Sequence, residues 1–179
     1  MIKKDAGIYG YVFNGYWNDV GRPETFLKAT YDILDQKIEH DFHKAKIGNV
    51  WVGKNVSIDK KARIEGPVVI GNNCIIGKGC KISKGSVIGD NVSIGKNVNI
   101  DGSVIFTDSV IEDYSSLNRC IIDKECFIDK NSVLESGVIA GSMVEIGKNS
   151  IVKASHSIKN NMKILPNSII NSDHEMVAK

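Results

Sequence analysis

Residues 70–100 read IGNNCIIGKGCKISKGSVIGDNVSIGKNVNI, and an aliphatic residue returns at every sixth position. Outside this stretch the period continues in both directions, with a gap between Phe106 and Ile122. Its members are Val52, Ile58, Ile64, Ile70, Ile76, Ile82, Ile88, Ile94, Ile100 and Phe106, then Ile122, Ile128, Leu134, Ala140, Ile146, Val152, Ile158, Ile164 and Ile170. An amphipathic helix repeats near 3.6 residues and an alternating strand near 2, so neither explains a period of six. Such a fixed repeat is typical of a stacked solenoid.

Three sixes predict a triangular coil of eighteen residues, in which residue i stacks on residue i+18. Coils would then rise by about 4.8 Å each, the spacing of hydrogen-bonded strands. The predicted inward ladders are Val52–Ile70–Ile88–Phe106, Ile58–Ile76–Ile94 and Ile64–Ile82–Ile100. Asn55, Asn73, Asn91 and Asn97, with Gly79 and Gly85 in the same slot, would lie at corners, because both residue types tolerate positive φ.

The repeat slips over residues 107–121, where sixteen residues separate Phe106 from Ile122 instead of eighteen. Apolar residues in this segment appear out of phase with the repeat. A solenoid coil buries its end only by stacking on a neighbour. We therefore expect one irregular coil inside a continuous prism and no break into two domains.

The composition narrows the class of protein. The 179 residues carry a net charge of +2, with lysines that look scattered along the chain, so nothing favours a nucleic-acid partner. No stretch of 18 apolar residues predicts a membrane span. Cys74, Cys80, Cys120 and Cys126 each stand two residues before a member of the repeat, a slot otherwise filled mostly by valine. They are therefore interpreted as small buried apolar residues, in keeping with a cytoplasmic protein.

Residues 1–45 lack the period of six. Residues 8–13 (IYGYVF) are predicted to form a strand, and Pro23 suits the first turn of a helix over residues 23–38. Residues 39–46 read as a polar linker. One strand and one helix cannot make a core alone, so their apolar residues need a partner surface.

The stretch YWNDVGRP at residues 16–23, followed by FLKA at 26–29 and DIL at 32–34, resembles the closing segment of the catalytic domain of sugar-1-phosphate nucleotidyltransferases. The mannose-1-phosphate guanylyltransferase type is the most similar. Those enzymes continue into a hexapeptide-repeat, left-handed parallel β-helix, and the handedness expected here comes from this resemblance. The resemblance implies a remnant of the catalytic domain with its linker over residues 1–45, the β-helix over 46–171 and a tail over 172–179.

The same resemblance implies that the intact enzyme joins a nucleoside triphosphate to a sugar 1-phosphate and releases pyrophosphate. Asp19 matches the family's second metal-binding aspartate, which would hold Mg²⁺ together with an aspartate from the other half of the catalytic domain. The family's glycine-rich nucleotide loop is absent from these 179 residues. We therefore expect this chain alone to be inactive, with the β-helix serving assembly or regulation, as a homo-oligomer or beside the missing catalytic half.

Two alternatives stay open from the sequence. Hexapeptide folds also serve acyl-CoA-dependent acyltransferases, and His156 is the sole histidine of the predicted prism that could act as a general base. The other alternative is a non-catalytic structural subunit. Trp51, Ile75 and Met143 lie off the inward ladders and are candidates for a partner surface. Asp113, Asp123 and Asp129, near the slip, are expected to be solvated turn residues.

Overall fold

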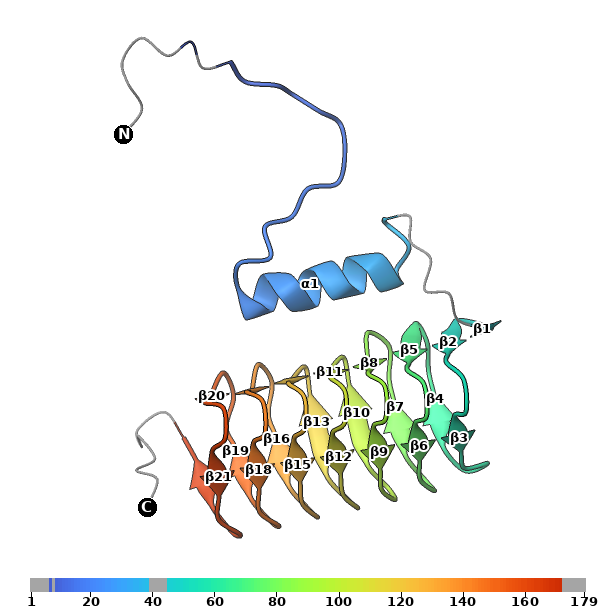
Figure 1. Ribbon diagram of the computed structural model, residues 1–179, viewed down its shortest axis with the longest axis vertical. Coiled ribbons are helices and arrows are strands. Elements are labelled where there is room, and N and C mark those ends of the chain that lie inside the picture. Colours follow the sequence, from blue (N-terminus) through green and yellow to red (C-terminus); the bar gives the residue numbers. More distant parts are fainter. Residues whose placement is uncertain (1–6, 8, 39–44, 172–179) are drawn as a thin grey trace.

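The computed structural model describes residues 7, 9–38 and 45–171. A triangular prism of stacked coils is covered along one face by a single helix, α1 (Pro23–Leu34) (Figure 1). The architecture is the left-handed parallel β-helix of hexapeptide repeats, as predicted. No helix among the described residues is long and apolar enough to span a bilayer.

Three parallel sheets form the faces of the prism. Sheet A comprises β1 (Ala45–Ile47), β2 (Val50–Val52), β5 (Val68–Ile70), β8 (Val87–Ile88), β11 (Val104–Ile105), β14 (Ile121–Ile122), β17 (Ile139–Ala140) and β20 (Ser157–Ile158). Sheet B comprises β3 (Ser57–Ile58), β6 (Ile75–Ile76), β9 (Ser93–Ile94), β12 (Val110–Ile111), β15 (Phe127–Ile128), β18 (Glu145–Ile146) and β21 (Lys163–Ile164). Sheet C comprises β4 (Arg63–Ile64), β7 (Lys81–Ile82), β10 (Asn99–Asp101), β13 (Ser116–Asn118), β16 (Val133–Leu134), β19 (Ile151–Val152) and β22 (Ile169–Ile170).

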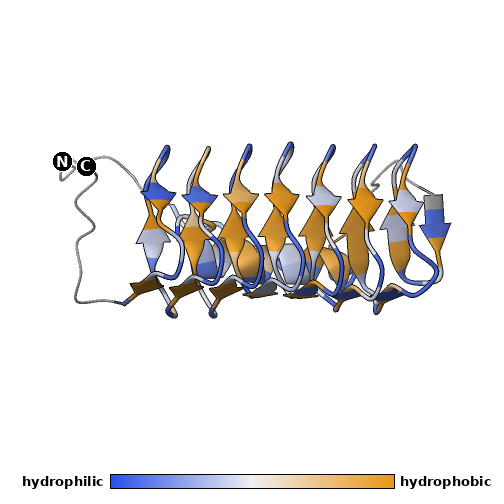
Figure 2. Cartoon of the chain, turned by 90° about the horizontal axis from the view of Figure 1, so that it is seen from below, coloured by the Kyte–Doolittle hydropathy of each residue, from blue (hydrophilic) through white to orange (hydrophobic). Residues whose placement is uncertain are grey.

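The chain passes from sheet A to B to C in each coil, so the prism has three corners, named A–B, B–C and C–A. β1 is the exception to the parallel stacking, since it pairs antiparallel with β2. Figure 2 shows the flat stack of coils, with hydrophobic strands between hydrophilic corners. Each strand turns one side chain of the repeat into the core and its neighbour outward, which is the ordinary alternation of a pleated strand.

The inward ladders are confirmed for most of the chain. Every repeat member from Ile70 to Ile100 and from Ile122 to Ile170 is buried, and residues eighteen apart are paired in register. Ile58, in the first coil, is 38% exposed because a neighbouring coil covers it on one side alone.

The prediction that Phe106 belongs to an inward ladder is wrong. Ile105 pairs with Ile88 and is fully buried, whereas Phe106 lies outside the core and is 38% exposed. The repeat therefore shortens by one residue between Ile100 and Ile105, and again between Leu117 and Ile122. Ile111 and Leu117, which seemed out of phase, are fully buried members of the ladders.

Both one-residue deletions fall at the C–A corner, in consecutive coils. Strands pair without interruption through them, from β8 to β11 to β14 to β17. The prediction of one continuous prism is confirmed, and its irregularity is a pair of shortened corners.

The corner residues have the predicted left-handed backbone. Asn55, Asn73, Asn91 and Asn97 have φ between +54° and +58°, and Gly79 and Gly85 are also positive. Side-chain amides stack as ladders along the corners, with Asn55 Nδ2 donating to Asn73 Oδ1 at 3.2 Å. The four cysteines are buried free thiols, as predicted. Burial raises the pKa of Cys120 to about 12.

The segment before the prism differs from prediction in two ways. No strand is present over residues 9–13, whose side chains are exposed with no sheet edge beside them. Helix α1 ends at Leu34 and not at residue 38, because Gln36 adopts φ +60° and Lys37 N–H donates to Asp32 O at 3.0 Å. This Schellman motif terminates the helix. Most of the predicted linker, residues 39–44, lies outside the described residues.

Candidate functional site

The interface at which α1 packs on sheet A is the most elaborate feature outside the core. The outward side chains of this sheet are apolar in six successive coils: Trp51, Val69, Val87, Val104, Ile121 and Ile139. Sheets B and C carry Ser, Lys, Asn, Arg or Glu at many equivalent positions. An apolar outward stripe cannot face water without cost, and α1 covers part of it. Its signal in the sequence is an apolar residue directly before the inward-facing residue of each sheet A strand, which at Val104 requires Ile105, and not Phe106, as that inward residue.

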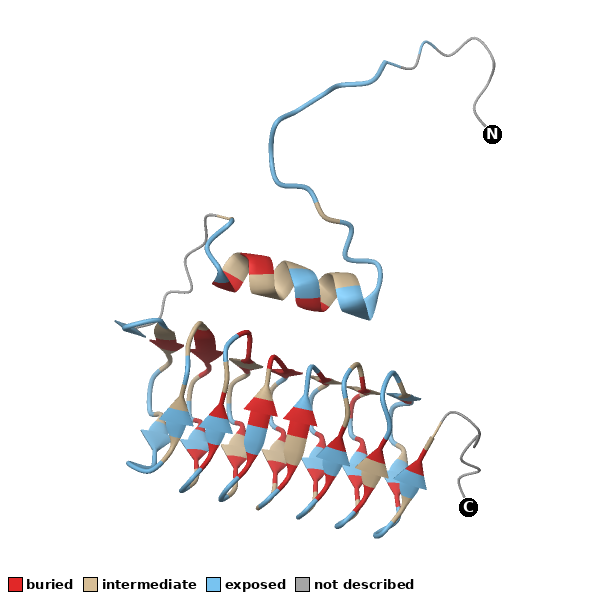
Figure 3. Ribbon diagram, turned by 180° about the vertical axis from the view of Figure 1, so that it is seen from behind, coloured by how far each residue is buried: buried red, intermediate tan, exposed pale blue. Residues whose placement is uncertain are grey.

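Helix α1 lies along sheet A (Figure 3). Contacts at both of its ends hold it there. Near its first turn the ring of Phe26 stacks on Phe106, with centroids 6.3 Å apart. At its last turn Leu34 is 2% exposed and packs with Trp51 and Val69. Trp51, expected to be exposed, is 7% exposed because the helix covers it. The predicted partner surface for the helix is therefore the prism itself.

Two successive C–A corners, at Gly85 and at Gly102, contact the side chain of Tyr31. Its hydroxyl donates a hydrogen bond to the carbonyl of Gly102 at 2.5 Å, and its ring lies over Gly85. A Cβ added at Gly85 would lie 2.8 Å from that ring, so glycine is required there for close approach as well as for its φ of +83°. Burial raises the pKa of Tyr31, opposed by the charge of Arg119. The hydroxyl therefore stays protonated and acts as a donor.

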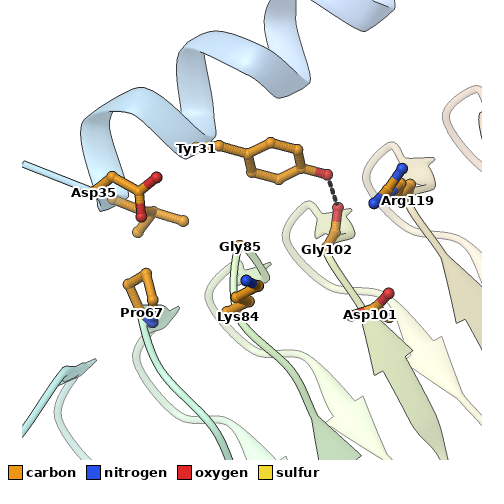
Figure 4. Close-up of a pocket in the computed structure, with 9 residues that line it drawn as sticks. Tyr31, Asp35, Pro67, Lys84, Gly85, Asp101, Gly102 and Arg119 are labelled. Atoms are coloured by element: carbon orange, nitrogen blue, oxygen red, sulfur yellow. Dashed lines mark hydrogen bonds between the residues drawn. The ribbon is translucent and has the colours of Figure 1, made fainter. Parts of the chain in front are cut away.

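A cavity of about 230 Å³ opens beside Tyr31, between the end of α1 and the C–A corners (Figure 4). Charged side chains of both signs line it: Asp35 and Asp101, with Lys84 and Arg119. Arg119 has φ +48° in a slot that Gly85 and Gly102 fill in earlier coils. The lining offers donors, acceptors and a tyrosine hydroxyl, and no thiol or histidine. Its chemistry suits binding and not nucleophilic attack.

A second, more apolar hollow of about 400 Å³ lies at the start of α1. It is lined by Val20, Gly21, Arg22, Pro23 and Phe26 on one side, and on the other by Phe106, Ile121, Asp123, Ile139, Ala140 and Gly141. It exposes the part of the sheet A stripe that α1 leaves uncovered. The loop that carries Asp19 borders this hollow.

Asp32 ties the loop before α1 to the helix. Its carboxylate accepts hydrogen bonds from Tyr16 Oη at 2.9 Å, Lys28 Nζ at 2.7 Å and Lys37 Nζ at 2.5 Å. The side chain of Asp32 is buried among these partners. The two ammonium groups and the hydroxyl hold its pKa well below the usual range for an aspartate. This cluster was not foreseen from sequence.

Neither of the two predicted site residues, Asp19 and His156, lies in a group of described side chains arranged for catalysis. Asp19 is exposed, and its Oδ1 accepts a hydrogen bond from Gly21 N–H at 3.0 Å. Magnesium needs several oxygen ligands, and no cluster of three His, Cys, Asp or Glu that could hold a metal occurs in the described part of the chain. The residues present therefore do not make a Mg²⁺ site by themselves, and the assignment of Asp19 stays a prediction.

His156 is half-buried at the C–A corner, directly before β20. Its slot points into the core, since Ser103, Cys120 and Val138 fill it in earlier coils and are buried. It lines neither of the two hollows beside α1. Asp113, Asp123 and Asp129 are turn residues, as predicted, and their carboxylates accept backbone N–H groups of Lys96, Lys124 and Lys130.

The family model of the EIF2B subunit epsilon LbH domain matches residues 47–152, more than half of the chain. The chain belongs to this family. The chain, with its EIF2B-epsilon-type β-helix, is also similar over short stretches to curated enzymes. Glucose-1-phosphate adenylyltransferase of Mycoplasma mobile is 47% identical over 34 residues, 19% of this chain and 9% of that protein. The Clostridium novyi enzyme of the same name is 40% identical over 43 residues, 24% of this chain and 11% of that protein.

The chain thus matches about a tenth of the length of these relatives, and the matches support a hexapeptide domain of the type found at the C-terminal end of nucleotidyltransferases. Solved structures share the fold. A hexapeptide transferase family protein from Anaplasma phagocytophilum aligns with TM-score 0.62 and 22% identity, over 69% of this chain and 79% of that one. AntD, an N-acyltransferase from Bacillus cereus, aligns with TM-score 0.55 and 25% identity, over 59% of this chain and 74% of that one.

Proposed function

We propose that this chain is the C-terminal portion of a sugar-1-phosphate nucleotidyltransferase, in which α1 joins the catalytic domain rigidly to the EIF2B-epsilon-type β-helix. The intact enzyme would form a nucleotide sugar and pyrophosphate from a nucleoside triphosphate and a sugar 1-phosphate. The β-helix would serve assembly or regulation.

The observation that carries the proposal is the contrast between α1 and the segment that precedes it. The helix buries its apolar side on sheet A, whereas Tyr9, Tyr11 and Trp17 are 93%, 88% and 74% exposed. Exposed aromatic side chains in one short segment are typical of a surface that another domain covers. The Asp32 cluster holds the intervening loop, so the segment leaves the prism in a defined direction.

The partial matches to glucose-1-phosphate adenylyltransferases support the reaction class, and their names suggest ATP and glucose 1-phosphate. The YWNDVGRP stretch is similar to the mannose-1-phosphate guanylyltransferase type. The test therefore compares both combinations of sugar and nucleotide base. In this proposal Asp19 contributes one carboxylate to a Mg²⁺ site whose other ligands belong to the catalytic half.

Pyrophosphate release provides the test. The chain would be assayed alone and after co-expression with a nucleotidyltransferase chain that bears the glycine-rich loop, using ATP with glucose 1-phosphate and GTP with mannose 1-phosphate. We expect turnover in the co-expressed complex and its loss with Asp19→Ala, while Asp59→Ala, at an exposed turn in the first coil, leaves it unchanged. Turnover by the isolated chain, or a complex indifferent to Asp19→Ala, would refute the proposal.

The likeness to AntD makes acyl transfer the competing function. His156 is the residue such a reaction would need, yet its slot faces the core and neither hollow beside α1 includes it. Titration with coenzyme A and acetyl-coenzyme A separates the two functions. Saturable binding that His156→Ala abolishes would favour an acyltransferase over the nucleotidyltransferase portion.

A further inference from the structure

Sheet B carries a separation of charge that the sequence hides. Lysines that look scattered in the chain stack on one another, because residues eighteen apart lie in consecutive coils. Lys60, Lys78 and Lys96 occupy one slot of the B–C corner in three successive coils. The expectation that lysines do not cluster is therefore wrong in three dimensions.

Each sheet B strand with its flanking corners spans eight residues. Segments 54–61, 72–79 and 90–97 contain five lysines and two aspartates, a formal charge of +3. Segments 107–114, 124–131 and 142–149 contain three lysines and six carboxylates, a formal charge of −3. Among the six strands from β3 to β18, sheet B thus has a positive half, β3, β6 and β9, and a negative half, β12, β15 and β18. The seventh strand, β21, lies beyond the negative half, and its segment 160–167 carries one lysine and no carboxylate. The five lysines of the positive half form no ion pair with another described residue.

Each half also exposes one large apolar side chain at its centre. Ile75 in β6 is 56% exposed, and Phe127 in β15 is 39% exposed. They are equally far from the boundary between the halves, since β9 and β12 lie between β6 and β15. Helix α1 covers sheet A, and no described segment covers sheet B (Figure 1).

Two corner residues of the negative half have a strained backbone, and their side chains do not pack against the described part of the fold. Tyr114 and Met143 adopt φ of +64° and +58°, in slots that asparagine or glycine fill in several other coils. Left-handed backbone costs roughly 1–2 kcal/mol at a residue with a bulky side chain. Both side chains nevertheless remain exposed, at 59% and 44%, so the fold does not use them for packing.

We infer that sheet B is an isologous interface, which pairs with sheet B of a second copy of this chain about a two-fold axis parallel to the strands, between β9 and β12. This inference goes beyond the proposed function and does not depend on it. The rotation reverses the order of coils, so the positive half of each copy covers the negative half of the other. Ile75 then meets the partner's Phe127, and each such contact occurs twice.

Charge selects this axis over the other way of pairing two such faces. An axis along the prism would place each coil over its own counterpart, with like halves together. In this register Lys96 lies opposite the partner's Asp113, with the partner's Tyr114 beside it, and Asn55 lies opposite the partner's Met143, next to Lys54. The exposed residues in strained corners thereby acquire contacts. Lys60 and Lys78 lie opposite the partner's Lys148 and the partner's Lys130, so the preference for this axis comes from the net charge of the halves.

Sedimentation equilibrium of the full chain tests the association. We expect a dimer in low salt, with a dissociation constant at least tenfold weaker in 0.5 M NaCl because salt screens exposed charges. Phe127→Glu and Ile75→Glu should each abolish the dimer. Val133→Glu is the matched control, since Val133 is outward-facing and 36% exposed on sheet C. A wild-type monomer at 200 μM in low salt, or a dimer broken by Val133→Glu and not by Phe127→Glu, would overturn the inference.

Cross-linking tests the axis. Under mild oxidation, an equimolar mixture of Ile75→Cys and Phe127→Cys chains should form a disulfide-linked heterodimer, while neither variant alone should form a homodimer. The four native thiols are buried and do not compete. Efficient self-cross-linking of Phe127→Cys would place the axis along the prism and contradict the arrangement. Circular dichroism of each variant confirms that loss of dimer is not loss of fold.

Discussion

The hydroxyl of Tyr31 donates a hydrogen bond to the carbonyl of Gly102, a residue 71 positions further along the chain. Gly102 lies in the first of two corners that are each one residue shorter than the rest of the C–A edge. The slip in the repeat and the packing of the helix meet at this corner, where the Tyr31 hydroxyl reaches Gly102 while its ring lies over Gly85 in the preceding, full-length corner.

Removing that hydroxyl should weaken the seat of α1. Tyr31→Phe loses one hydrogen bond to a buried carbonyl, so we expect the free energy of unfolding to fall by about 1 kcal/mol. Urea denaturation followed by circular dichroism measures the difference. Tyr9→Phe is the control, because Tyr9 is 93% exposed and should change stability little. Equal stabilities for Tyr31→Phe and wild type would show that water replaces the bond without cost.

Gly85→Ala should cost more than the same change at Gly137. Both glycines occupy the C–A slot with similar φ, +83° and +79°, so the backbone strain is shared. A Cβ at Gly85 meets the Tyr31 ring at 2.8 Å, whereas one at Gly137 meets Ser155 Oγ at 3.3 Å. The excess loss of stability, about 1–2 kcal/mol by analogy with overpacking in cores, should disappear in a Tyr31→Ala background. An excess that persists there would rule out the helix as its cause.

Ile105→Ala and Phe106→Ala should separate the core from the helix seat. Ile105 is fully buried in the ladder. Its truncation to alanine should therefore lower the free energy of unfolding by about 2–5 kcal/mol, the usual range for a buried isoleucine. Phe106 is 38% exposed and stacks on Phe26, so its truncation should cost about 1 kcal/mol. Chemical denaturation of the two variants gives the comparison. A larger loss for Phe106→Ala would restore Phe106 to the core ladder.

Stability should fall in acid through Asp32. Its pKa is lowered in the fold by Lys28, Lys37 and Tyr16, relative to about 3.9 in an unfolded chain. A lowered native pKa means that the contribution is complete above pH 4–5 and is lost as the pH falls through the native value. The Tm of wild type should therefore drop more steeply between pH 5 and pH 2 than that of Asp32→Asn. Asp35→Asn, at an exposed neighbouring carboxylate, should keep the wild-type slope.

The four thiols should not react with thiol reagents while the protein is folded. All are buried, and burial raises the pKa of Cys80, Cys120 and Cys126. Labelling by a thiol reagent at pH 8 should therefore proceed at the rate of unfolding and reach four equivalents in denaturant. Asn99→Cys, at an exposed position of β10 on sheet C, should add one equivalent that reacts within the mixing time. Rapid labelling of a native cysteine in wild type would contradict its place in the core.

Much of the fold was predictable because it repeats. Ile70 to Ile100 and the four cysteines could be placed from spacing alone, since every coil presents the same environment to the same slot. Errors arose where a single contact breaks the repeat. Phe106 and Trp51 face α1, and residues 9–13 form no strand because no sheet edge lies beside them. None of these positions has a periodic signature of its own.

The sequence by itself determined the prism, its corners and the inert thiols, because a period of six imposes one backbone solution on a stacked chain. Only the tertiary structure decided where the helix lies, which residue, Ile105 or Phe106, enters the core, and how the charges of distant coils combine on sheet B. Those outcomes depend on residues far apart in the chain that meet once. A contact made once leaves no repeat to detect, whereas a contact made in every coil is written along the whole sequence.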